Sequence, residues 1–114
     1  MRVLVADDAQ TMAALVVEAV RLAGHEVIAV APDAQTALGG VRELAPAAVI
    51  LDGRLTGRVP ELVAELIAAA PTVRIFVLVA LGELALLRAC GLAGAVGGLR
   101  RPLAAHEVAA ALGR

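Results

Sequence analysis

Three of the four aspartates in the chain directly follow short apolar runs that are typical of buried strands. Asp7 and Asp8 come after residues 3–6, and Asp52 comes after residues 48–51. Ligands bind at the carboxyl ends of parallel strands, so we expect the three carboxylates to meet at one sheet edge. Carboxylates at such short range repel one another, so they call for a divalent cation. A site with only oxygen ligands suits Mg²⁺. The alternative is that these aspartates only cap the helices that follow the strands.

The elements that position these aspartates alternate along the chain. Short, β-branched apolar runs predict strands at residues 3–6, 27–30, 48–51, 75–79 and, weakened by two glycines, 95–99. Apolar residues at helical spacing predict helices at residues 12–22 before Gly24, 34–44 after Asp33, 60–67 with Pro60 first, 83–90 before Gly91, and 104–112. This order predicts an α/β, doubly wound parallel sheet.

Length and composition favour a single domain that spans residues 1–114. Of these residues 61% are hydrophobic and only 18% are charged, which excludes general disorder. The longest uncharged stretch, Ala89 to Leu99, is far shorter than the ~18–20 residues of a membrane span. We therefore expect no association with a membrane.

The charge and cysteine content narrow the possible partners and the cell compartment. Ten basic and eleven acidic residues nearly cancel, which gives no indication of direct nucleic-acid binding. The one cysteine, Cys90, allows no internal disulfide and fits a reducing compartment, and we expect it in the core. The first residues do not form a signal peptide, so we expect a cytoplasmic protein. We expect His25 and His106 at the surface.

Four segments of the chain carry a family resemblance, in order and in spacing: residues 3–8, 23–27, 46–52 and 94–103. They resemble the first strand and acidic pair, the turn into the second strand, the phosphoacceptor strand, and the last strand with its Lys-Pro in receiver domains of bacterial two-component response regulators. The resemblance covers essentially the whole chain. It implies a (βα)5 flavodoxin-like, or CheY-like, sandwich whose five-stranded parallel sheet has the order 2-1-3-4-5.

The resemblance also implies a role for individual residues. Asp52 would be the phosphoacceptor, taking a phosphoryl group from a sensor histidine kinase or a phosphotransfer protein. Asp8 and Asp52 would bind Mg²⁺ directly, Asp7 would bind it through water, and the backbone carbonyl of Arg54 would be another ligand. Pro102 would follow a cis peptide bond that aims the preceding side chain into the site. On this reading the domain is a signalling module and not an enzyme.

Three of the positions that depart from the family pattern bear on phosphate binding and switching. Val79 replaces the Thr or Ser whose hydroxyl binds the phosphoryl group, Arg101 replaces the Lys, and Gly98 replaces an aromatic residue. One hypothesis is that Asp52 is still phosphorylated, with Arg101 or Arg54 as the phosphate clamp. The other is a pseudo-receiver, a protein-interaction module that does not depend on phosphate. The three retained acids favour the first hypothesis, and the lost hydroxyl and aromatic ring favour the second.

The resemblance further suggests how the domain meets its partners. The family commonly dimerises or docks through helix four, strand five and helix five, so a homodimer through this face is expected. Because the sequence ends after one short final helix, we expect it to contain no DNA-binding output domain. We therefore expect either a stand-alone regulator or a piece of a longer protein.

Overall fold

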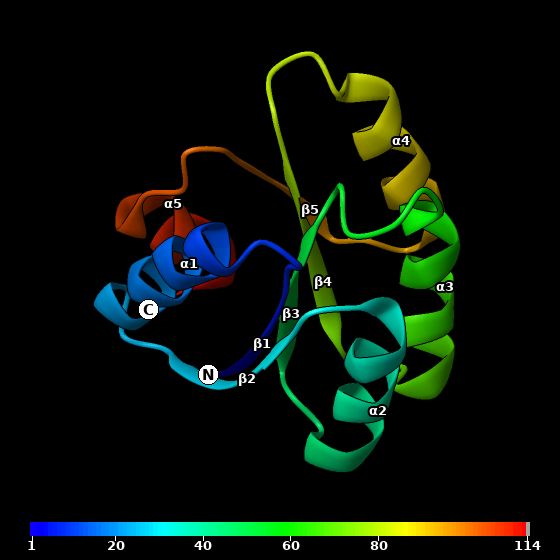
Figure 1. Ribbon diagram of the computed structural model, residues 1–114, viewed down its shortest axis with the longest axis horizontal. Helices are drawn as coiled ribbons and strands as arrows, with labels where there is room; N and C mark the ends of the chain where they lie inside the picture. The colour runs from blue at the N-terminus through cyan, green and yellow to red at the C-terminus, as the bar shows by residue number, and fades with distance from the viewer. Residues whose placement is uncertain (114) are drawn as a thin grey trace.

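A five-stranded parallel sheet forms the centre of the molecule (Figure 1). The computed structural model describes residues 1–113. The strands lie in the order β2-β1-β3-β4-β5 and comprise β1 (Arg2–Ala6), β2 (Glu26–Ala31), β3 (Ala48–Asp52), β4 (Arg74–Val79) and β5 (Gly97–Arg100). All adjacent pairs are parallel. The doubly wound (βα)5 fold with the order 2-1-3-4-5 is confirmed.

Helices cover both faces of this sheet. One face carries α1 (Gln10–Leu22) and α5 (Ala105–Leu112), and the other carries α2 (Ala34–Leu44), α3 (Val59–Ala69) and α4 (Leu84–Ala93) (Figure 1). Among residues 1–113 there is no helix with the length and apolar character that a membrane crossing requires.

The continuous apolar runs of the central strands reflect this double coverage. Every residue of β3 is buried, with Ile50 in the core beneath α1 and α5, and Val49 and Leu51 in the core beneath α2, α3 and α4. A strand covered on both faces has no side that tolerates polar residues. The first charged residue of β3 is therefore its last one, Asp52, at the carboxyl edge.

The helix ends follow from local chemistry. Asp33 caps α2, since its carboxylate accepts a hydrogen bond from the Thr36 N–H at 2.7 Å. Pro60 lies in the first turn of α3, where its missing N–H costs no hydrogen bond. Gly24, just after α1, has a φ of 91°. This left-handed conformation is one that glycine adopts readily, as expected for the residue that ends a helix.

Two predicted boundaries near the end of the chain were wrong. The fourth helix continues through Gly91 to Ala93 and ends at Gly94, which has a φ of 118° and so makes the left-handed turn. The fifth strand starts at Gly97 and not at Ala95, because the Ala95 N–H still bonds the Cys90 carbonyl at 2.9 Å. Residues 94–96 thus form the connection between α4 and β5.

Candidate functional site

Asp7, Asp8 and Asp52 lie together at the carboxyl edge of the sheet. Each offers a carboxylate oxygen, and these oxygens all lie within 4.8 Å of one another. Asp7 and Asp8 follow β1, and Asp52 ends the neighbouring strand β3, so parallel pairing brings them together. Asp7 and Asp52 are buried, whereas Asp8 is exposed. Two buried carboxylates and one exposed carboxylate form a strongly anionic site that opens to solvent on one side.

One buried oxygen atom of these acids has no hydrogen-bond partner among residues 1–113. Asp7 Oδ1 accepts a bond from the Ala9 N–H at 2.9 Å, and Asp52 Oδ1 accepts one from the Arg54 N–H at 3.1 Å. Asp7 Oδ2 is also buried, yet it receives no hydrogen bond from residues 1–113. A buried polar atom in this state is uncommon and calls for an explanation. A cation held by the three acids would supply it, and an oxygen-only donor set fits Mg²⁺.

Arg101 brings a positive charge into the same site. Its guanidinium forms an ion pair with Asp52, and its Nη2 also donates to the Leu78 carbonyl at 3.4 Å. The Arg101–Pro102 peptide bond is cis. The two paired side chains are only 12% and 6% exposed, so water screens their attraction weakly. Arg101 therefore neutralises part of the charge of the acid cluster.

A cavity of about 250 Å³ opens onto these groups and is lined by Asp8, Ala9, Met12, Asp52, Arg54 and Arg101. We call this space the acid cavity. The sequence had singled out Arg54 twice, for its backbone carbonyl as a metal ligand and for its side chain as the alternative to Arg101 as phosphate clamp, and Arg54 does line the acid cavity. Met12 also lines the acid cavity and was not predicted as a site residue, although its place in the first turn of α1, just after the acid pair, is a signal that it lies near the site.

Glu83 is a further polar residue near the site that sequence reasoning missed. Its Oε1 accepts a hydrogen bond from the Ala80 N–H at 2.6 Å, and its Oε2 lies 3.9 Å from Nε of Arg54. This arrangement depends on the turn at Gly82, whose φ of 91° folds the chain back on itself. The sequence indicated Glu83 only as the start of a helix, because no spacing rule connects it with Arg54.

Val79 and Gly98, two of the positions that depart from the family pattern, lie in apolar surroundings. Val79 is buried at the end of β4, in the core beneath α2, α3 and α4. At Gly98, an added Cβ would lie 2.6 Å from Cδ1 of Leu87, so this α4 side chain already occupies the space over the glycine. The space next to β5 is therefore taken by a leucine of the neighbouring helix, and no aromatic ring from β5 is present there.

The remaining candidates lie away from the acid cavity. The prediction that His25 lies at the surface was wrong: it is buried, and its Nε2 donates to the Gly113 carbonyl at 2.6 Å. The turn before β2 thus packs under the end of α5. His106 is exposed and Cys90 is fully buried, as expected. Burial raises the pKa of the Cys90 thiol, and the negative charge of Glu61 adds to this shift.

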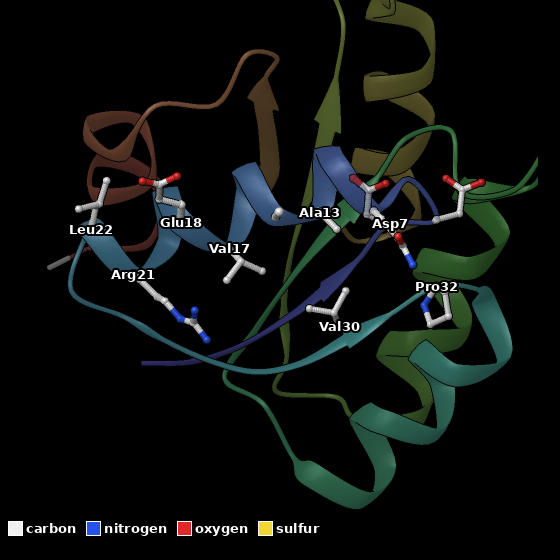
Figure 2. Close-up of a pocket in the computed structure, with 11 residues that line it drawn as sticks. Asp7, Ala13, Val17, Glu18, Arg21, Leu22, Val30 and Pro32 are labelled. Atoms are coloured by element: carbon white, nitrogen blue, oxygen red, sulfur yellow. The ribbon is translucent and has the colours of Figure 1, made fainter.

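A larger cavity of about 780 Å³ lies between α1 and the edge strand β2. Figure 2 shows Asp7 and Pro32 at one end, Arg21 and Leu22 at the other, and Val30 between them on the floor. Its walls are mainly apolar, and it shares Asp7 and Asp8 with the acid cluster. The acids therefore border two hollows, one on each side of the start of α1.

Comparison with known proteins identifies the family. A family model described as the response regulator receiver domain matches residues 3–113, whereas no curated protein matches significantly. The chain is similar in structure to the signal receiver domain of NarL from Mycobacterium tuberculosis, with 27% identity, a TM-score of 0.87 and coverage of 97% of this chain and 91% of that one. It is also similar to the receiver domain of NtrX from Brucella abortus, with 27% identity, a TM-score of 0.82 and coverage of 93% and 90%.

A third similar structure is a response regulator protein from Burkholderia pseudomallei with a phosphorylated aspartic acid, a calcium ion and citrate. It shares 25% identity and a TM-score of 0.84, over 97% of this chain and 65% of that one. The family match, the topology and the three clustered aspartates agree with one another. The chain therefore belongs to the response regulator receiver domain family of two-component systems.

Proposed function

We propose that this receiver domain accepts a phosphoryl group on Asp52 from a phosphohistidine of a sensor histidine kinase or a phosphotransfer protein. The observation that carries the proposal is the position of Asp52. Its buried carboxylate lies between two further acids and the Arg101 guanidinium, at a cavity open to solvent. A nucleophile, a cation site and a phosphate clamp thus share one cavity, which is what phosphoryl transfer requires.

Neighbouring groups of the chain orient the Asp52 carboxylate for nucleophilic attack on phosphorus. Its Oδ1 is fixed by the Arg101 guanidinium and by the Arg54 N–H, which leaves Oδ2 as the attacking atom. A bond forms between Oδ2 and phosphorus while the bond between phosphorus and the donor's imidazole nitrogen breaks. The bonding electron pair returns to the imidazole ring, which takes up one proton. Arg101 then pairs with the charged oxygens of the transferred group.

The three aspartates would hold Mg²⁺ together with the backbone carbonyl of Arg54. When bound, the metal neutralises negative charge, so that an anionic donor can approach an anionic acceptor. The buried Asp7 Oδ2, which receives no hydrogen bond from the described residues 1–113, supports this use of the site. Further support comes from the Burkholderia pseudomallei protein, whose structure contains a phosphorylated aspartic acid and a calcium ion.

Incubation with acetyl phosphate and Mg²⁺, followed by intact-mass measurement, tests the proposal. We expect the wild-type protein to gain the mass of one phosphoryl group and the Asp52→Ala variant to gain none. Asp33→Ala is the matched control, because Asp33 is an exposed helix cap that is not one of the three clustered carboxylates, and we expect it to be labelled like the wild type. Absence of an adduct on the wild-type protein would contradict the proposal.

Two observations favour a second candidate, a protein-interaction module that works without phosphate. Val79 has no hydroxyl group for a phosphoryl contact, and Leu87 covers Gly98 where the family has a movable aromatic ring. This candidate predicts that partner binding is the same in wild-type and Asp52→Ala protein. If phosphorylation of Asp52 still changes the conformation of the domain, Val79→Thr should strengthen that conformational change. Under both candidates the domain is a signalling module, and sustained phosphatase turnover on small phosphate esters would contradict both.

A further inference from the structure

Glu83 is held against the end of β4 by contacts that do not serve its own helix. It precedes the first turn of α4, where a side chain usually accepts bonds from the helix's free N–H groups. Glu83 makes no such capping bond. Its carboxylate instead accepts the Ala80 N–H at 2.6 Å and lies 3.9 Å from the guanidinium of Arg54.

The two donors that Glu83 holds lie next to Asp52. Arg54 lines the acid cavity together with Asp52 and Arg101. Ala80 directly follows Val79, whose carbonyl accepts the Arg101 N–H at 3.0 Å. The Ala80 N–H therefore lies at the sheet edge where the ends of β3, β4 and β5 meet. A group added to Asp52 would be close to both donors.

We propose that the Glu83 carboxylate is a resident anion, which a phosphoryl group on Asp52 displaces from the Ala80 N–H and from Arg54, releasing the start of α4. This inference builds on the phosphorylation of Asp52 proposed above. A phosphoryl group brings about two negative charges and three acceptor oxygens, so it competes for the same donors and repels the carboxylate. Glu83 is a positioning residue in this scheme, because it acts on the phosphoryl site through Ala80 and Arg54.

The displacement would couple the phosphoryl site to the surface formed by α4 and β5, a coupling that Val79 and Gly98 do not provide. Val79 has no hydroxyl to pull toward a phosphoryl group, and Gly98 has no ring to rotate. Glu83 is joined to the helix that follows, since its carbonyl accepts the Leu87 N–H at 3.1 Å. Leu87 in turn covers Gly98 on β5. A movement at Glu83 would therefore reach the surface formed by α4 and β5 within one helical turn.

The test compares Glu83→Ala and Glu83→Gln with the wild-type protein. Two readouts are measured: the rate of labelling by acetyl phosphate with Mg²⁺, followed by intact mass, and hydrogen exchange of residues 80–87 before and after labelling. The matched control is Glu61→Ala, which removes another glutamate–arginine ion pair, the one formed with Arg58 at 3.7 Å at the start of α3. Thermal unfolding of all four proteins shows whether any change is merely a loss of stability.

We expect Glu83→Ala to be labelled about three- to tenfold faster, as removal of one repelling charge at a partly solvated site predicts. Residues 80–87 should exchange faster in this variant before labelling and change little afterwards. In the wild-type protein the same residues should exchange faster only after labelling. Glu83→Gln keeps an acceptor for the Ala80 N–H without the charge, so it should be intermediate. Glu61→Ala should match the wild type in both readouts.

The two proposals fail in different ways. If the wild-type protein is labelled but exchange at residues 80–87 is unchanged, the Glu83 inference is overturned while phosphorylation of Asp52 stands. Equal labelling rates for wild type and Glu83→Ala would also overturn it. If neither protein is labelled, the phosphorylation proposal fails, and the Glu83 inference fails with it.

Discussion

At the scale of single residues, Arg101 has the largest electrostatic effect on the acid cluster. Its guanidinium and the Asp52 carboxylate are both largely buried, so each compensates the other's loss of hydration. Removing one partner of such a pair leaves an uncompensated buried charge. In this protein that charge would be part of a cluster of three carboxylates.

We therefore expect Arg101→Ala to lower the free energy of unfolding by about 3 kcal/mol in the absence of divalent cations. Mg²⁺ should restore part of this loss, because the ion takes over the charge compensation. Urea unfolding with and without Mg²⁺ measures both effects, with Arg101→Lys as the charge-conserving control. A loss that is the same with and without Mg²⁺ would contradict this account.

Arg101→Ala should also abolish the conformational response of the domain to beryllofluoride. An unchanged response would exclude Arg101 as the phosphate clamp.

Cys90 provides a prediction about pH. Burial raises its pKa above the ordinary value of 9.0, so the folded protein holds the thiol proton more tightly than the unfolded chain. The stabilisation is fully present below pH 9 and is lost as the pH rises through the raised pKa. Thiol labelling of the native protein at pH 8 should be about a hundredfold slower than in denaturant. Labelling of the native protein at the rate of a free thiol would show that Cys90 is accessible.

The residues of the site differ in how far the sequence could predict them. The acids were predictable, because Asp7, Asp8 and Asp52 directly follow buried strands whose parallel pairing fixes where they meet. Glu83 was not, because its contact with Ala80 depends on the φ of one glycine in the intervening turn. The burial of His25 was not predictable either, since it depends on the end of α5 packing over a turn distant in sequence.

At the scale of elements, the loop after β3 approaches β4 very closely. The Gly53 N–H donates to the Leu78 carbonyl at 2.9 Å. A Cβ added at Gly53 would lie 2.9 Å from that same carbonyl oxygen and 3.0 Å from Cδ2 of Leu86. The carbonyl belongs to a central strand and cannot move aside freely. Glycine next to Asp52 thus allows the close approach that places the acid.

We expect Gly53→Ala to lower the free energy of unfolding by about 1–3 kcal/mol, the usual cost of overpacking. It should also slow phosphoryl labelling, since Asp52 is the adjacent residue. Gly57→Ala is the matched control, because an added Cβ there would have no atom within 4 Å. Urea unfolding measures the free energy of unfolding of both variants. Equal values would show that the loop adjusts without strain and would contradict the prediction.

The element boundaries show where sequence patterns stop being informative. Strands β1, β3 and β4 were predictable because they are buried on both faces and leave continuous apolar runs. The end of α4 was not, because Gly91 and Gly94 are equally plausible helix terminators in sequence. The structure selects Gly94, where a Cβ would collide with Cδ1 of Ile67, whereas the space beside Gly91 is open.

At the scale of the whole molecule, exposed apolar side chains gather on and beside α4. Leu84, Arg88 and Leu92 follow at four-residue intervals and so form one ridge along this helix. Leu92 is 92% exposed and Leu84 is 56% exposed. Leu81 and Val96, in the loops before and after the helix, are also exposed. This ridge belongs to the surface through which a homodimer is expected.

We expect the protein to self-associate through this surface, because its net charge of −1 gives little repulsion between copies. Leu92→Glu should shift sedimentation equilibrium toward the monomer by introducing a charge that must be desolvated in the interface. Leu22→Glu is the matched control, since Leu22 is a 71% exposed leucine on α1. A purely monomeric wild type, or equal effects of the two substitutions, would contradict a dimer through α4.

The pairing of β1 with β2 has a consequence for how copies of this chain can meet. Val3 pairs with Val27, but the next residue, Leu4, pairs with Ala29, so Ile28 is an extra residue in the edge strand. Such a bulge bends and twists the strand, and a bent edge is a poor template for a second strand. The free edge of the sheet at β2 is thereby protected against the strand-to-strand stacking that leads to aggregation. For a chain with so apolar a composition, this local irregularity favours reversible contacts between helices over irreversible growth of the sheet.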